Sequence, residues 1–182
     1  MKPASLLLGG FLSLLSGSLL AQPEFDFMPD GGRQILRRVF GGSLADLSAA
    51  ASAIHETADW RAMIVARTSA LTPKEVETLA SYLTVNAPLA PDKVAAATSV
   101  DALAAAFPPD GKELAIANCQ FCHGFFSGYL AHERDAEGWR SIFKSPFHKE
   151  LPMSAKERET FAVYSAINMP IPYQDVPEDF RF

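Results

Sequence analysis

Cysteine and basic residues are scarce in this sequence. Only two of its 182 residues are cysteine, and 21 acidic residues outnumber 16 basic ones, which gives a formal net charge of −5. No basic run is present, so the chain lacks the surface with which proteins bind nucleic-acid phosphates. A second cysteine or histidine pair is also missing, which excludes a structural zinc site with four protein ligands.

Both cysteines fall in one motif, Cys119-Gln120-Phe121-Cys122-His123, which has the spacing C-x-x-C-H. This is the attachment sequence of a c-type haem: two thiols bond to the porphyrin vinyl groups, and the histidine supplies an axial nitrogen to the iron. A redox cysteine pair would be expected near a βαβ pattern, whereas residues 110–118 have a helical pattern. A structural disulfide would leave His123 without a role. The motif therefore predicts one covalently attached haem c.

Residues 1–21 have the pattern of a secretory signal peptide. Lys2 is followed by the apolar stretch 6–15 and then by small residues up to Ala21, where we expect cleavage. The apolar stretch is short and contains glycine and serine, so it is a poor membrane span; an uncleaved anchor is the alternative. Cleavage leaves 161 of the 182 residues, without a membrane span and with room for one ordinary domain or two small ones.

The rest of the sequence contains one pattern twice, in residues 32–94 and 111–176, and such repeats indicate repeated structural units. In this register the two cysteines and the histidine of the motif align with Phe40, Ser43 and Leu44. The first copy therefore cannot attach or ligate a haem. We predict two tandem units, a haem-less one in residues 22–96 and a haem-binding one in residues 97–182. Apolar side chains such as Phe40 and Leu44 would fill the space that a porphyrin takes in the second unit.

The expected secondary structure is all helix and loop. Thr72 and Ser154 each begin a capping box, with a glutamate three residues later. The helices that follow are expected to end before the next proline. Residues 87–98 read as a linker, and residues 99–107 as a short extra helix capped by Ser99. The prediction is an all-α fold.

Residues 108–172 resemble class I cytochrome c. The resemblance rests on a helix that runs from Gly111 into the C-x-x-C-H motif, on Arg134 and Trp139, and on a last helix that carries Tyr164. It implies a small α-helical fold in which His123 is the proximal iron ligand and Trp139 and Tyr164 contribute to haem binding. Arg134 stands where family members often direct a polar side chain toward a haem propionate; a solvated surface arginine is the alternative.

The resemblance also implies a location and a kind of work. Haem attachment in this family takes place outside the bacterial cytoplasm, which agrees with the signal peptide and predicts a periplasmic protein. Electrons would pass between redox partner proteins: a dehydrogenase, an oxidase or a quinone-linked complex. No catalytic residue is predicted. One alternative is a haem-bearing accessory or docking subunit of a periplasmic oxidoreductase complex, and another is a haem sensor or enzyme with an open iron site.

At the sixth iron ligand the sequence departs from this family. Members usually supply a methionine from the loop before the last helix, near the position that Pro146 holds here. Residues 145–153 offer His148 and Met153 instead. His148 lies six residues before the cap Ser154, which leaves loop length to reach over a haem, whereas Met153 is adjacent to that cap. We expect His148 to be the distal ligand, with Met153 as the alternative.

Overall fold

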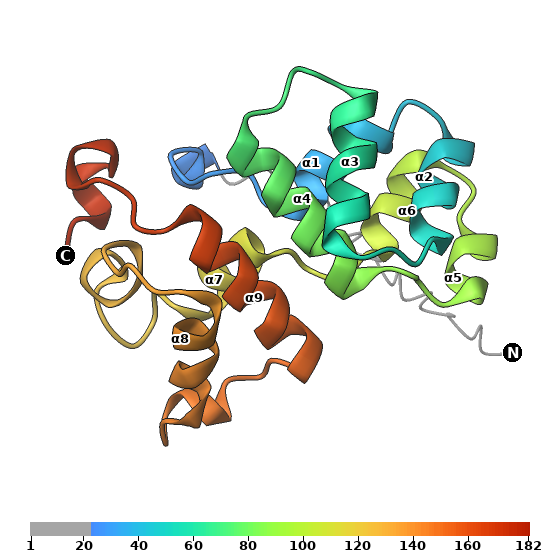
Figure 1. The fold of residues 1–182 in the computed structure, drawn as a ribbon. Helices are drawn as coiled ribbons and strands as arrows, with labels where there is room; N and C mark the ends of the chain where they lie inside the picture. The colour runs from blue at the N-terminus through green and yellow to red at the C-terminus, as the bar shows by residue number, and fades with distance from the viewer. Residues whose placement is uncertain (1–22) are drawn as a thin grey trace, which may run out of the picture.

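The computed structural model describes residues 23–182, which form helices and loops without a β-strand (Figure 1). The all-α prediction is confirmed. The nine α-helices of this part of the chain are α1 (Gly32–Phe40), α2 (Leu44–Ser52), α3 (Thr57–Arg67), α4 (Pro73–Asn86), α5 (Pro91–Ala96), α6 (Val100–Ala106), α7 (Gly111–Asn118), α8 (Ala136–Ser141) and α9 (Ala155–Asn168). Among the short turns are η1 (Pro23–Phe25), the π-helical turn η2 (Phe126–Leu130), η3 (Ile142–Lys144) and η4 (His148–Glu150).

The predicted signal peptide, residues 1–21, lies outside the described residues. Among residues 23–182, no helix is both long and apolar enough to cross a bilayer. The first described element is η1, in which the side chain of Phe25 is buried.

Several helices begin and end where the sequence predicts. Thr72 and Ser154 cap α4 and α9, each in a complete capping box with the glutamate three residues later. Ser99 caps α6 through the backbone N–H of Ala102. Such caps satisfy N–H groups that have no partner within the helix, and each contributes about 1 kcal/mol.

The predicted linker, residues 87–98, is not all loop. It contains α5 (Pro91–Ala96), with Pro91 in the first turn and Asp92 near the N-terminus. A proline costs little in the first turn because that N–H has no partner within the helix, and an acidic residue there favours the helix dipole. The same residues that suggest a break can therefore also begin a helix.

One hydrophobic core lies among α1, α2, α3, α4 and α6. Phe40 is 4% exposed and belongs to this core, and Leu44 packs against it. The ring centroids of Phe40 and Trp60 are 6.4 Å apart. Apolar side chains therefore fill this core at the two positions that align with Cys119 and His123.

A second core lies among α7, η2, α8 and α9. At its centre the ring centroid of Trp139 is 5.3 Å from that of Tyr129 and 5.7 Å from that of Phe161. Met153 and Tyr164 also belong to this core. Cys119, the first residue of the C-x-x-C-H motif, packs against this core.

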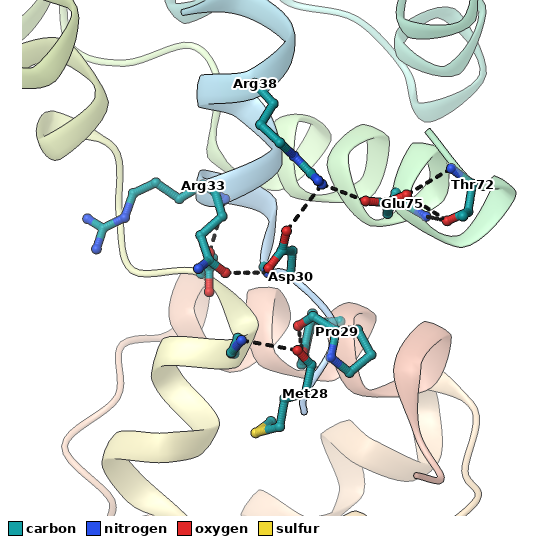
Figure 2. A network of polar contacts seen from close by, with 12 residues as sticks. Met28, Pro29, Asp30, Arg33, Arg38, Thr72 and Glu75 are labelled. Carbon is teal, nitrogen blue, oxygen red and sulfur yellow. Dashed lines mark hydrogen bonds and ion pairs between the residues drawn. The ribbon is translucent and has the colours of Figure 1, made fainter. Parts of the chain in front are cut away.

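Each core also takes up side chains from the other side of residue 96. Phe25 and Met28, near the beginning of the described chain, are buried in the second core, whereas Leu103 and Phe107 are buried in the first. Figure 2 shows residues 28–30 running between α1 and α7. The carbonyl of Met28 accepts a hydrogen bond from the buried Lys112 at 3.1 Å. The segments before and after the helices of the first core thus connect the two cores.

Helices α4 and α9 lie against one another and join the two cores (Figure 1). Asn86 of α4 donates to the hydroxyl of Thr160 in α9 at 3.0 Å, and Asn168 of α9 donates to the hydroxyl of Thr78 in α4 at the same distance. All four side chains are buried. The two bonds are reciprocal, since each helix supplies one asparagine and one threonine.

Candidate haem-attachment site

Helix α7 delivers the C-x-x-C-H motif. Asp110 caps the helix through the N–H of Glu113, and Cys119 stands at its C-terminus. The Cys119 side chain is partly buried against the second core, whereas Cys122 and His123 are exposed. Both cysteines are free thiols. The motif therefore lies at the surface with one thiol on the protein side and its histidine open to a ligand.

Burial raises the pKa of the Cys119 thiol to about 12. Thiolate is the reactive form of cysteine, and cysteines that exchange disulfides have a lowered pKa. A pKa near 12 leaves almost no thiolate at neutral pH. Cys119 is therefore not a thiol that would attack a disulfide; in a thiol–disulfide exchange that part would fall to the exposed Cys122.

The imidazole of His123 is fixed on one side. Its Nδ1 lies 3.2 Å from the carbonyl oxygen of Gly124, which can only accept a hydrogen bond. In the neutral ring, Nδ1 therefore carries the hydrogen and Nε2 keeps its lone pair. The ring also passes close to Gly128, where an added Cβ would stand 1.9 Å from Nδ1. A glycine is needed there for the imidazole to keep its place.

His148, in η4, lies close to His123. The centroids of the two imidazole rings are 6.3 Å apart, and the ring planes are at 85° to one another. Nδ1 of His148 lies 3.1 Å from the hydroxyl of Ser145. Histidines that bind metals usually donate the hydrogen of their other ring nitrogen to an oxygen, and both imidazoles have such a partner at Nδ1.

The spacing of the two rings fits one iron between them. With metal–nitrogen bonds of about 2 Å to each ring, imidazoles on opposite sides of one metal have centroids roughly 6 Å apart. No group of three or more histidine, cysteine, aspartate or glutamate side chains in residues 23–182 could hold a bare metal ion. A haem does not need such a group, because the porphyrin holds the iron and the protein supplies only axial ligands.

Exposed aromatic side chains stand next to both histidines. Phe121, within the motif, is 75% exposed, and Phe147, beside His148, is 88% exposed. Large apolar side chains at the surface are favourable where an apolar group covers them. A porphyrin attached at Cys119 and Cys122 would supply such a group. The sequence showed both residues, but their exposure appears only in the structure.

Met153 is buried in the second core, whereas His123 is exposed and His148 is partly exposed. The Met153 side chain is 7% exposed and packs in the second core, beside the cap Ser154. Its carbonyl accepts from the Arg158 guanidinium at 3.1 Å, which holds this part of the chain against α9. Met153 thus occupies the place of an apolar residue that packs in front of a helix cap.

Tyr164 lies toward the other end of α7. Its ring packs against Gly111, at the first residue of that helix, whereas Cys119 follows the last one. Its hydroxyl donates to the carbonyl of Pro29 at 2.7 Å. The structure therefore brings Cys119, Cys122, His123 and His148 into one region but gives the hydroxyl of Tyr164 a different partner.

Arg134 and Trp139 are adjacent to one another. Arg134 is exposed, and its guanidinium carbon lies 5.6 Å from the centre of the buried Trp139 ring. The indole N–H of Trp139 has no acceptor among residues 23–182, a donor that a haem propionate could satisfy. The buried N–H of Trp60, in the core without cysteines, also lacks an acceptor there. This feature fits a haem without identifying one.

Comparison with known proteins yields no relative: no family model matches the chain, and neither does a curated protein or a solved structure. The functional argument therefore depends on the chemistry of the motif and on the geometry around it.

Proposed function

We propose that this protein is a periplasmic electron-transfer protein with one haem c, bonded to the thiols of Cys119 and Cys122. His123 and His148 are its axial ligands. The observation that carries this proposal is the pair of imidazoles at 6.3 Å, one of which belongs to the C-x-x-C-H motif. The haem supplies an iron centre that gains and loses one electron.

The residues around the site hold the group and set its potential. Thioether bonds to Cys119 and Cys122 would fix its position, while the Gly124 carbonyl and the Ser145 hydroxyl can accept the Nδ1 hydrogens and so leave both Nε2 atoms available. A methionine ligand opposite a histidine raises the reduction potential. Two imidazoles donate more electron density to the iron. We therefore expect a lower reduction potential than that of a protein with histidine and methionine ligands.

The first unit, residues 22–96, is structural in this proposal. Phe40 and Leu44 stand where the second unit has Cys119 and His123, and both pack in or against the first core. One motif therefore means one haem per chain. Export by the signal peptide, residues 1–21, would bring the chain to the compartment where its haem is attached and where its redox partners operate.

A haem count tests the proposal. The full chain is produced in a bacterial host with a haem-attachment system, and the pyridine haemochrome is compared with the protein concentration. We expect one haem per chain, which stays on the denatured polypeptide in a gel stained for haem peroxidase activity. Cys119→Ser together with Cys122→Ser should abolish the stain. A colourless wild-type protein, or two haems per chain, would contradict the proposal.

A further inference from the structure

Ser145 lies next to the proposed distal ligand, His148. It follows η3, its backbone N–H donates to the carbonyl of Ile142 at 3.1 Å, and its own carbonyl accepts from Lys149 at 3.0 Å. The partly buried hydroxyl lies 3.1 Å from Nδ1 of His148 and 3.4 Å from the backbone N–H of the same residue. One side chain thus contacts both the ring and the backbone of His148.

The direction of the bond between Ser145 and His148 decides which ring nitrogen can bind a metal. If the hydroxyl oxygen accepts the hydrogen of Nδ1, Nε2 keeps its lone pair. If the hydroxyl donates to Nδ1, the neutral ring carries its hydrogen on Nε2 and cannot bind iron there. The hydroxyl oxygen already accepts from the backbone N–H of His148, and its second lone pair is left for the Nδ1 hydrogen, which is the arrangement that iron binding at Nε2 requires.

The two imidazoles differ in how they are held. The partner of His123 Nδ1 is a backbone carbonyl, that of Gly124, whereas the partner of His148 Nδ1 is a side-chain hydroxyl, that of Ser145. Only the second contact can be removed by a conservative substitution. It also lies on the short loop between η3 and η4, outside the C-x-x-C-H motif.

We propose that Ser145 is a positioning residue for the distal ligand. Its hydroxyl selects the His148 tautomer with a free Nε2, and it holds the ring toward His123. This inference rests on the proposed haem function and adds a role for Ser145 to it. Removing the hydrogen-bond partner of a metal-bound histidine typically lowers the affinity for the metal on the order of 10- to 100-fold.

The test compares Ser145→Ala with Ser145→Thr and Ser141→Ala in the full, haem-loaded chain. Threonine keeps the hydroxyl. Ser141 is a nearby serine whose hydroxyl donates to the carbonyl of Gly138 at 2.7 Å. The readouts are the low-spin fraction of the oxidised protein by electron paramagnetic resonance, the rate of carbon monoxide binding to the reduced protein, and the reduction potential.

We expect Ser145→Ala to bind carbon monoxide about tenfold faster than wild type or more. Its low-spin fraction should fall and its reduction potential rise, because the ring donates less strongly without its acceptor. Ser145→Thr and Ser141→Ala should both stay close to wild type. Circular dichroism of each variant checks that the helices are retained.

Two results would overturn the inference. In the first, Ser145→Ala keeps the spin state, the carbon monoxide rate and the potential of wild type. In the second, Ser145→Thr behaves like Ser145→Ala, which would assign the effect to packing rather than to the hydroxyl. The haem count of the wild-type protein separates these failures from failure of the proposed function, because it does not depend on the distal side.

Discussion

At the scale of single residues, the choice between His148 and Met153 is the sharpest question that the structure raises. His148 is partly exposed with its ring 6.3 Å from that of His123, whereas Met153 is buried in the second core. We expect His148→Ala to convert the oxidised haem from low to high spin, or to open the reduced iron to carbon monoxide. Met153→Leu, which keeps an apolar side chain of similar volume, should leave the spectrum nearly unchanged.

The wild-type spectrum provides a separate check on the same ligand. A methionine bound to oxidised haem iron gives a sulfur-to-iron band in the near infrared, which a protein with two histidine ligands lacks. Presence of that band, together with its loss in Met153→Leu, would assign the ligand to Met153. Rapid carbon monoxide binding by the wild type would indicate an open iron and favour sensing or catalysis.

Phe40 tests the structural role of the first core. It is 4% exposed, it packs at 6.4 Å from the Trp60 ring, and the Arg67 guanidinium lies 4.9 Å from its ring centre. Phe40→Ala should lower the free energy of unfolding by roughly 3–5 kcal/mol, because it leaves a cavity in a packed core. Denaturant titration measures the loss. The haem spectrum of the folded variant should remain that of wild type; a large spectral change at unaltered stability would mean that this core touches the haem.

At the scale of elements, the capping signals in the sequence were sufficient to locate the beginnings of the helices that have them. The capping boxes at Thr72 and Ser154 located the beginnings of α4 and α9, and Ser99 located α6. Local signals could not locate η2, a π-helical turn whose conformation depends on what packs around it. Nor could they show that the Ser145 hydroxyl meets His148, since nothing in the spacing of two loop residues gives their orientation.

The reciprocal bonds between α4 and α9 lead to a prediction at this scale. Asn168 donates to the carbonyl of Tyr164 within α9 and to Thr78 across the interface, both at 3.0 Å. Asn168→Ala should lower the free energy of unfolding by about 1–3 kcal/mol, because it leaves buried polar groups without partners. Asn86→Ala, at the corresponding place in α4, should have a similar effect.

Asn118→Ala is the matched control for these two variants. Asn118 also donates to the carbonyl four residues earlier, that of Leu114, at 2.8 Å, so this hydrogen bond stays within its own helix. Its loss should therefore cost less than that of either interface asparagine. If all three variants lost the same stability in thermal denaturation, the bonds across α4 and α9 would contribute nothing beyond the local ones.

At the scale of the whole molecule, the two cores are coupled rather than merely adjacent. Phe25 and Met28 precede α1 in the sequence but are buried in the second core, and Phe107 precedes α7 but is buried in the first. The repeat in the sequence suggested two separate units divided near residue 96. It could not show that side chains cross into the other core, because an alignment shows which segments correspond and not where their side chains pack. Coupling of this kind favours unfolding in one cooperative step.

Asp110 contacts a helix of each core with one side chain. It is fully buried, and its two carboxylate oxygens accept from the N–H of Glu113 in α7 and the N–H of Arg33 in α1, both at 3.1 Å. Gly31 stands at the cap of α1, and a Cβ there would lie 2.1 Å from the Asp110 carboxylate. Asp110 thus caps one helix of each core. The charged side chains around it are Arg33 and Glu113, which are paired with one another.

Ionisation of Asp110 should make the stability of the whole molecule depend on pH. Burial and repulsion from Glu113 raise its pKa to about 6 in the folded protein, against the lowering effect of the two N–H groups and of Arg33. The unfolded chain ionises at the ordinary pKa of 3.8, so between these values the folded state binds more protons. Stability from this group is therefore full below pH 3.8 and is lost as the pH rises toward 6.

This difference between the folded and unfolded pKa of Asp110 corresponds to roughly 3 kcal/mol in the free energy of unfolding. We expect the free energy of unfolding of wild type, measured relative to Asp110→Asn in denaturant titrations, to fall by about that amount between pH 4 and pH 7 and then level off. Asparagine keeps an oxygen for one helix but cannot ionise, so subtraction removes the contribution of the titrating groups that do not interact with Asp110. A difference that is flat across this range, or that rises with pH, would mean that the two helix N-termini and Arg33 outweigh burial and keep Asp110 charged.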